Sequence, residues 1–209
     1  ALTHRSYLNE HKKSASEHNE RLEFLGDAVL ELVTTDFLFS NYDKPEGILT
    51  AWRSALVRTE SIGAAGERIG YEKIIRMSRG EKQGSARARQ QILANAFEAT
   101  TGAIYLDKGY EAAKKYITDN ILSTLPQILE EESWRDPKSY LQEISQARDG
   151  FTPIYKVLKE DGPDHDKNFT LGVFVGDKKM GEGEGPSKQT AQQEAAREAI
   201  RKYKNNEKR

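Results

Sequence analysis

Residues 19–30 place acidic and apolar side chains at the spacing of an α-helix. The apolar positions are three or four residues apart: Leu22, Leu25, Val29 and Leu32. That spacing predicts one apolar stripe along a helix. Glu20, Glu23 and Asp27 follow the same spacing and form an acidic stripe beside it. Like charges so placed destabilise a helix by about 0.2–0.5 kcal/mol per pair. The pattern therefore indicates a cation site, with a solvated acidic face as the alternative.

Gly26 lies in the middle of this helix, where glycine costs about 1 kcal/mol relative to alanine. Such a glycine usually marks the close approach of another backbone. A second helix, predicted over residues 86–106, carries several small side chains: Ala99, Gly102 and Ala103. Asn95 and Glu98 are three residues apart on this helix and share a face. We expect the two helices to pack through their small residues, so that Glu98 meets the acidic stripe.

The six residues 23–28, EFLGDA, resemble the signature of the ribonuclease III family. Three further segments resemble other parts of that family: LTHRSY (residues 2–7), EGILTAWRSALVR (residues 46–58) and ILANAFEATTGAIYLDKGY (residues 92–110). The resemblance implies that Glu23, Asp27 and Glu98 are metal ligands and catalytic residues. Asn95 stands where the family most often has Asp, and we expect its amide oxygen to bind the metal or a metal-bound water. Family members usually carry another helix before the first segment, so a helix can be missing here.

Glu46 matches a family acid that lies near the dimer interface and assists at the catalytic valley. The alternative is an acid favoured at a helix start by the helix macrodipole.

An acidic cluster that holds a divalent metal suits phosphodiester cleavage, because the metal offsets the phosphate charge and activates water. Carboxylates without histidine or cysteine favour Mg²⁺, or Mn²⁺ in its place, over zinc.

The pattern changes after residue 136. A predicted helix over residues 138–147 precedes three predicted strands, over residues 151–160, 169–175 and 178–183. Gly176 and Asp177 form a hairpin turn between the last two strands. Ser187 can cap a final helix that continues to residue 203. The order α-β-β-β-α is that of a double-stranded RNA-binding domain.

Several positions in this part resemble the RNA-binding positions of such domains: Gln142, Glu143, Pro163, His165, Ser187 and Lys188. The start of the last helix often carries two or three lysines, whereas this chain has only Lys188, with Gln189 and Gln192 at the other positions. Acidic and basic side chains are nearly balanced over residues 136–209. We therefore expect modest RNA affinity and a weak dependence on salt.

Composition excludes several other classes of protein. Net charge is −1, mean hydropathy is −0.77 and cysteine is absent. No apolar run approaches the roughly 18 residues of a membrane helix, and residues 1–13 do not resemble a signal peptide. Without cysteine there is neither a disulfide framework nor a thiolate metal site. These features predict a cytoplasmic protein with no membrane contact.

Together, the residues and the resemblance predict an all-α endonuclease domain over residues 1–132. A small α+β (α-β-β-β-α) double-stranded RNA-binding domain follows over residues 137–207. The resemblance implies a homodimer, formed through the nuclease domain, in which each site cuts one RNA strand. It also implies products with 5′-phosphate and 3′-hydroxyl ends, and a role in the maturation of rRNA and mRNA. Two alternatives stay open: a weak or inactive RNA-binding scaffold, favoured by Asn95, and a metal-dependent nucleotide phosphohydrolase.

Helical periodicity predicts four long helices in the first part of the chain: residues 19–40, 46–65, 86–106 and 110–131. Pro126 is expected to interrupt the last of these. Residues 78–89 read as a basic loop that leads into a helix and suits phosphate contact, with a plain solvated loop as the alternative. His4 is expected to pack or to cap a helix.

Overall fold

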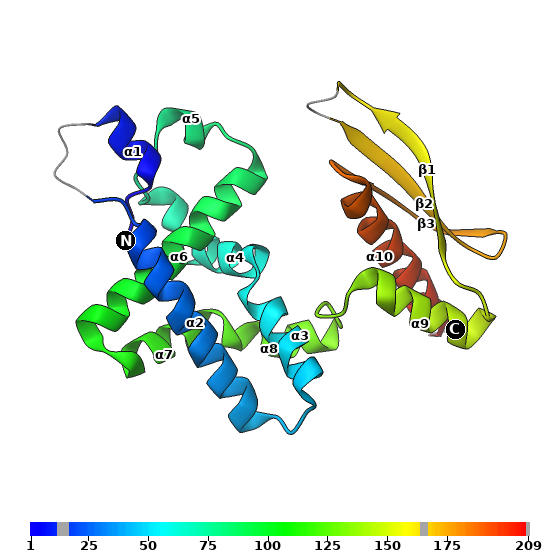
Figure 1. The fold of residues 1–209 in the computed structure, drawn as a ribbon, viewed down its shortest axis with the longest axis horizontal. Coiled ribbons are helices and arrows are strands. Elements are labelled where there is room, and N and C mark those ends of the chain that lie inside the picture. The colour runs from blue at the N-terminus through cyan, green and yellow to red at the C-terminus, as the bar shows by residue number, and fades with distance from the viewer. Residues whose placement is uncertain (12–16, 164–166, 208–209) are drawn as a thin grey trace. The chain divides into compact units, whose positions relative to one another are not determined.

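The computed structural model describes residues 1–11, 17–163 and 167–207, which form two compact units (Figure 1). The first unit covers residues 1–134 and the second residues 135–209. The two sets of core residues do not overlap. Each unit therefore buries its own apolar surface and is stabilised by its own core.

The first unit is helical in its described residues, apart from loops and an isolated β-bridge between Thr3 and Arg76. Its helices, with η marking a 3-10 helix, are α1 (Arg5–Glu10), α2 (Glu20–Asn41), α3 (Glu46–Val57), α4 (Thr59–Ile69), η1 (Tyr71–Lys73), α5 (Arg79–Lys82), α6 (Ala86–Lys108), α7 (Tyr110–Asn120), η2 (Leu122–Thr124) and α8 (Leu125–Glu130). The predicted all-α class is confirmed. Among the described residues, no helix combines the length and the apolar character needed to cross a membrane.

Helices α2 and α6 pack against each other through glycines (Figure 1). A methyl group on Gly26 would lie 1.7 Å from the carbonyl oxygen of Glu98. One on Gly102 would lie 2.3 Å from the carbonyl oxygen of Leu22. Since no other residue type lacks a Cβ atom, only glycine permits this approach. The expected packing through Gly26 and the small residues near Gly102 is confirmed.

The buried face of α2 differs from the predicted apolar stripe. Leu32 was expected in that stripe, but its side chain is 58% exposed. Val29 is buried as predicted, and Leu25 packs against the core, but the other buried residues of α2 lie outside the predicted stripe: Gly26, Leu30, Val33, Thr34 and Leu38. The contact at Gly26 decides which face turns inward, because α6 approaches α2 on that side.

Two predicted helices are divided. Residues 46–65 break at Arg58, whose extended backbone ends α3 and starts α4. The new direction brings Gly63 and Gly66 of α4 into contact with α6. Residues 110–131 break at Ile121, and Pro126 lies in the first turn of α8, where proline is tolerated. Residues 78–89, predicted as a basic loop leading into a helix, contain the short helix α5, capped by Ser78, and α6 then begins at Ala86 as predicted.

The second unit contains α9 (Pro137–Asp149), β1 (Ile154–Asp161), β2 (Asn168–Val175), β3 (Lys178–Gly185) and α10 (Lys188–Glu207). The strands form an antiparallel sheet in the order β1-β2-β3. Helix α10 lies against β2 and β3, and α9 packs on α10 (Figure 1). Gly181 and Gly183 allow the close contact, because a methyl group on either would meet backbone atoms of α10 within 2.5 Å. The predicted α-β-β-β-α order is confirmed.

Candidate active site

Three of the predicted site residues come together where α2 crosses α6. Glu23 and Asp27 lie on α2, one turn apart, and Glu98 lies on α6. The Glu98 backbone is in contact with Gly26, between the two α2 acids. The three carboxylates are close enough for Glu23 and Asp27 to shift the pKa of Glu98. The glycine contact therefore converts two separate sequence motifs into one acidic cluster.

The cluster holds more negative charge than its surroundings neutralise. Burial, followed by the charges of Asp27 and Glu23, raises the pKa of Glu98 to about 8. Burial, followed by the charges of Glu20 and Asp27, also raises the pKa of Glu23. A carboxyl group in such a position binds a proton at neutral pH unless a cation takes the proton's place.

Asn95 lies beside this cluster on α6. Its amide oxygen accepts a hydrogen bond from the side-chain nitrogen of Gln91, with an N···O distance of 2.7 Å. Its side chain is also hydrogen-bonded to Glu23, which lowers the pKa of that carboxyl against the other contributions. Gln91 did not stand out in the sequence, although its spacing of four residues from Asn95 is the signal that could have identified it.

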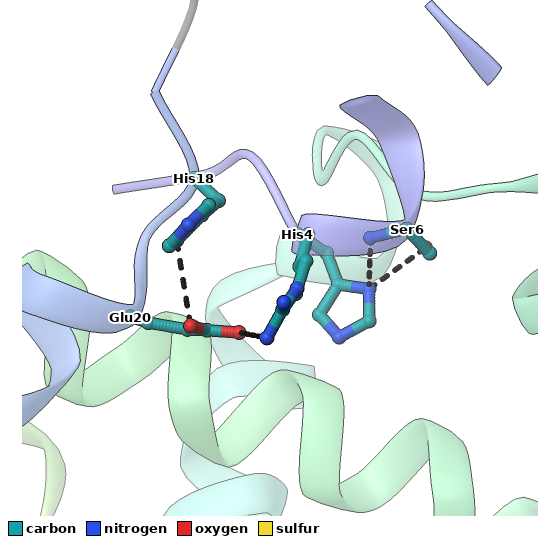
Figure 2. A network of polar contacts seen from close by, with 5 residues as sticks. His4, Ser6, His18 and Glu20 are labelled. Atoms are coloured by element: carbon teal, nitrogen blue, oxygen red, sulfur yellow. Dashed lines mark hydrogen bonds and ion pairs between the residues drawn. The ribbon is translucent and has the colours of Figure 1, made fainter. Parts of the chain in front are cut away.

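Glu20 belongs to the acidic stripe in the sequence but lies beside Arg5 and His18 in the structure. Its carboxylate lies 3.5 Å from the Arg5 guanidinium and 3.7 Å from His18. Figure 2 shows the contact between His18 and Glu20, next to a separate contact between His4 and Ser6. His4 caps α1 by accepting a hydrogen bond from the Ser6 N–H, as expected. Glu20 is thus partly neutralised, unlike the three carboxylates of the cluster.

The donor set of the cluster fits a hard divalent cation. In the described part of the chain, Glu23, Asp27 and Glu98 form no ion pair with lysine or arginine. Carboxylate oxygens without nitrogen or sulfur donors are typical of Mg²⁺ or Mn²⁺ sites. Over the same described residues, no three His, Asp or Glu side chains yet enclose a metal position. The residues present therefore match the cation in the chemistry of their donor atoms.

Glu46 lies elsewhere in the same chain. It begins α3 and accepts a hydrogen bond from the Thr50 hydroxyl, with an O···O distance of 3.3 Å. It lines a hollow of about 400 Å³ together with Thr35 and Phe39 of α2. Thr35 is eight residues beyond Asp27, which corresponds to about 12 Å along a helix. One chain alone therefore does not bring Glu46 to the acidic cluster.

The described members of the predicted RNA-binding set lie in the middle of α9, in the loop that follows β1 and at the start of α10. Gln142 and Glu143 are exposed on α9, and Glu143 pairs with Arg135 at 3.4 Å. Pro163 is exposed in the loop that follows β1, and His165 lies outside the described residues.

The helix starts adjoin each other. Ser187 accepts a hydrogen bond from the Thr190 N–H at 3.1 Å and so caps α10 as predicted. Lys188 pairs with Glu160 at 3.0 Å and lies 5.4 Å from the centre of the Phe169 ring. Gln142 of α9 and Gln189 of α10 line one hollow of about 580 Å³. Gln142 thus lies near the start of α10.

Comparison with known families agrees with both units. Residues 1–125 match the family model described as ribonuclease-III-like. Residues 137–203 match the double-stranded RNA binding motif. The fold and the acidic cluster thus define a nuclease domain of this type joined to a double-stranded RNA-binding domain.

Relatives match nearly the whole chain. Ribonuclease 3 of Streptococcus gordonii is 42% identical over 203 residues, which cover 97% of this chain and 87% of the relative. Ribonuclease 3 of Carboxydothermus hydrogenoformans is 45% identical over 206 residues, covering 98% and 88%. The chain belongs to the ribonuclease III family. These matches give no support to the alternatives of an inactive scaffold or a nucleotide phosphohydrolase.

A solved structure also matches the first unit. It is the nuclease domain of ribonuclease III from Campylobacter jejuni, described as showing structural flexibility in a region involved in dimer formation. It is 39% identical in sequence and covers 57% of this chain and 82% of that chain, with a TM-score of 0.50.

Proposed function

We propose that this protein is a Mg²⁺-dependent endoribonuclease that cuts double-stranded RNA to 5′-phosphate and 3′-hydroxyl ends. The observation that carries the proposal is the acidic cluster of Glu23, Asp27 and Glu98. It lies within the residues that match the ribonuclease-III-like model. The raised pKa values mark an uncompensated cluster, which is the charge state that a divalent cation stabilises. The same relationship supports a role in the cytoplasmic maturation of rRNA and mRNA.

Glu23, Asp27 and Glu98 would hold the metal, with Mn²⁺ able to replace Mg²⁺. A bound divalent cation offsets the phosphate charge, activates water and stabilises the leaving oxygen. The chain itself contributes orientation, because the glycine contact keeps the two helices at a set distance. Glu98 releases its proton when the cation binds, since the added positive charge favours the carboxylate.

Double-stranded RNA and a second copy of the chain are the proposed partners. Residues 137–207 would bind the duplex, whose A-form shape, phosphates and 2′-hydroxyls such domains read. Residues 1–132 would form the nuclease domain and the homodimer. Exposed apolar side chains on that domain support self-association: Phe24 at 82%, Leu32 at 58% and Phe39 at 79%. In the dimer, Glu46 would assist near the interface.

A cleavage assay tests this function. Purified protein is incubated with a labelled RNA duplex in Mg²⁺, in Mn²⁺ and in EDTA. We expect fragments with 5′-phosphates in either metal and an intact duplex in EDTA. If the duplex survives excess protein in both metals, the assignment as a nuclease is wrong.

Substitutions test the proposed metal-ligand roles of Asp27 and Glu98. Asp27→Asn and Glu98→Gln should abolish cleavage, because each removes one metal-binding charge. Both should bind the duplex as the unmodified protein does, since the RNA-binding unit is untouched. Glu111→Gln, on the first turn of α7, is the matched control and should cleave normally. Equal loss of binding in a gel-shift assay would contradict the metal-ligand roles.

A further inference from the structure

Gln91 occupies a place that the sequence motifs do not single out. It lies on α6, one turn before Asn95, with an exposed side chain. Its amide nitrogen donates to the Asn95 oxygen over 2.7 Å. Since an amide group has one oxygen and one NH₂ group, using the oxygen for Gln91 leaves the NH₂ group of Asn95 for Glu23. The Asn95–Glu23 hydrogen bond runs from α6 to α2 across the glycine contact.

We propose that Gln91 is a positioning residue, which holds the Asn95 amide so that its NH₂ group faces the Glu23 carboxylate. The inference rests on the proposed metal-dependent function. It also changes the role expected for Asn95 from the sequence. With its oxygen turned toward Gln91 and its NH₂ group toward Glu23, Asn95 serves as a donor that orients Glu23 rather than as a metal ligand.

A hydrogen-bond partner that fixes a ligand's orientation contributes to metal affinity without touching the metal. An NH₂ donor held in place by Gln91 restricts the rotation of the Glu23 carboxylate. Loss of Gln91 frees the Asn95 amide to rotate, so Glu23 spends less time in the orientation of a ligand.

Two substitutions of Gln91 separate its effect on the orientation of the Asn95 amide from the effect of a charge at position 91. Gln91→Leu removes both the donor and the acceptor at an exposed position, where the fold does not depend on it. Gln91→Glu leaves only acceptors, so it takes the hydrogen bond from the Asn95 NH₂ group and turns the amide oxygen toward Glu23. A simple charge effect predicts tighter Mg²⁺ binding for Gln91→Glu, because it adds a negative charge. The positioning role predicts weaker binding, because water and salt screen a charge at the exposed position 91, whereas the lost hydrogen bond acts on the Glu23 ligand itself.

The test is calorimetric titration of Mg²⁺ and Mn²⁺ into the metal-free protein without RNA. We expect Gln91→Leu and Gln91→Glu each to raise the dissociation constant by about three- to tenfold, at or below the usual range for residues behind a metal ligand. Gln127→Leu is the matched control. Gln127 of α8 is exposed and its amide nitrogen likewise donates to a side chain four residues on, Glu131 at the end of the helix, over 2.8 Å. Its substitution should leave metal binding unchanged.

A double-mutant cycle checks that Gln91 acts through Asn95. Asn95→Ala should weaken metal binding by itself, and adding Gln91→Leu should then change nothing further. Unchanged affinity in Gln91→Leu, or tighter binding in Gln91→Glu, would overturn the inference.

Glu98→Gln identifies which proposal has failed. If Glu98→Gln loses metal binding while the Gln91 variants do not, only the role of Gln91 is wrong. If the unmodified protein binds no metal, or Glu98→Gln binds it normally, the proposed metal site fails and the role of Gln91 fails with it.

Discussion

Glu98 is the residue whose ionisation couples the acidic cluster to pH. Its pKa in the folded protein is raised from an ordinary value of 4.5 to about 8 by burial, Asp27 and Glu23. Between these two values the folded protein binds a proton that the unfolded chain has released. The stabilising contribution of that proton is fully present below pH 4.5 and is lost as pH rises toward 8.

Glu98→Gln should therefore change the pH dependence of stability. In EDTA, the melting temperature of the unmodified protein should fall more steeply from pH 5 to pH 8 than that of Glu98→Gln. One kcal/mol corresponds to about 2–4 °C for a chain of this size. Adding Mg²⁺ at pH 8 should raise the melting temperature of the unmodified protein more than that of the variant. Parallel curves in EDTA would show that Glu98 ionises like an exposed carboxyl.

Asn95 decides how much negative charge the cluster offers to a metal. Asn95→Asp adds a carboxylate but removes the NH₂ donor to Glu23. Attraction between two unit charges about 4 Å apart, at an effective dielectric constant of about 20, is about 4 kcal/mol. A neutral hydrogen bond contributes about 1 kcal/mol. The added charge should dominate, so Asn95→Asp should lower the Mg²⁺ concentration needed for half-maximal cleavage.

The metal-free Asn95→Asp protein should melt at a lower temperature than the unmodified one, because a further like charge is confined beside the cluster. Titrating Mg²⁺ against cleavage rate for both proteins is the measurement. Superimposed curves would mean that position 95 lies beyond the influence of the metal.

At the level of helices, the site depends on the crossing of α2 and α6. Gly26→Ala should destabilise the first unit by about 1–3 kcal/mol or more, the usual cost of overpacking. The new methyl group meets backbone, which cannot rotate away as a side chain can. Cleavage should be lost as the carboxylates separate.

Gly47→Ala is the control in α3, where an added Cβ atom would have no contact within 4 Å outside its own helix backbone. It should be neutral or stabilise by up to about 1 kcal/mol. Urea unfolding of both variants decides the matter.

For the whole molecule, the separate cores predict independent folding of the second unit. Residues 135–209 should fold alone around their own buried residues, including Leu141, Val173 and Ala195. They should bind an RNA duplex more tightly than DNA of the same sequence, because the domain reads the A-form groove and the 2′-hydroxyls. Gel shifts on both duplexes test this, and equal affinity would contradict it. The near balance of charges in this unit predicts a weak dependence on salt.

Much of the fold could be predicted because its signals are local. The α-β-β-β-α order follows from a change in side-chain periodicity within about ten residues at a time, and Ser187 marks the start of α10 by its own capping hydrogen bond. The division at Arg58 could not be predicted this way. Residues 46–65 keep helical spacing throughout, and the break is favoured only because α4 can then place Gly63 and Gly66 on α6.

For the site, the spacing of Glu23 and Asp27 on one helix and of Asn95 and Glu98 on another already indicated two acidic faces. The contact between Gly26 and the Glu98 carbonyl oxygen decides which faces of α2 and α6 meet, and these two residues are more than seventy positions apart in the chain. The same contact leaves Leu32 at the surface and brings the Asn95 amide between Gln91 and Glu23. Periodicity places side chains around a single helix axis, whereas steric exclusion between two backbones determines how the helices are turned toward each other.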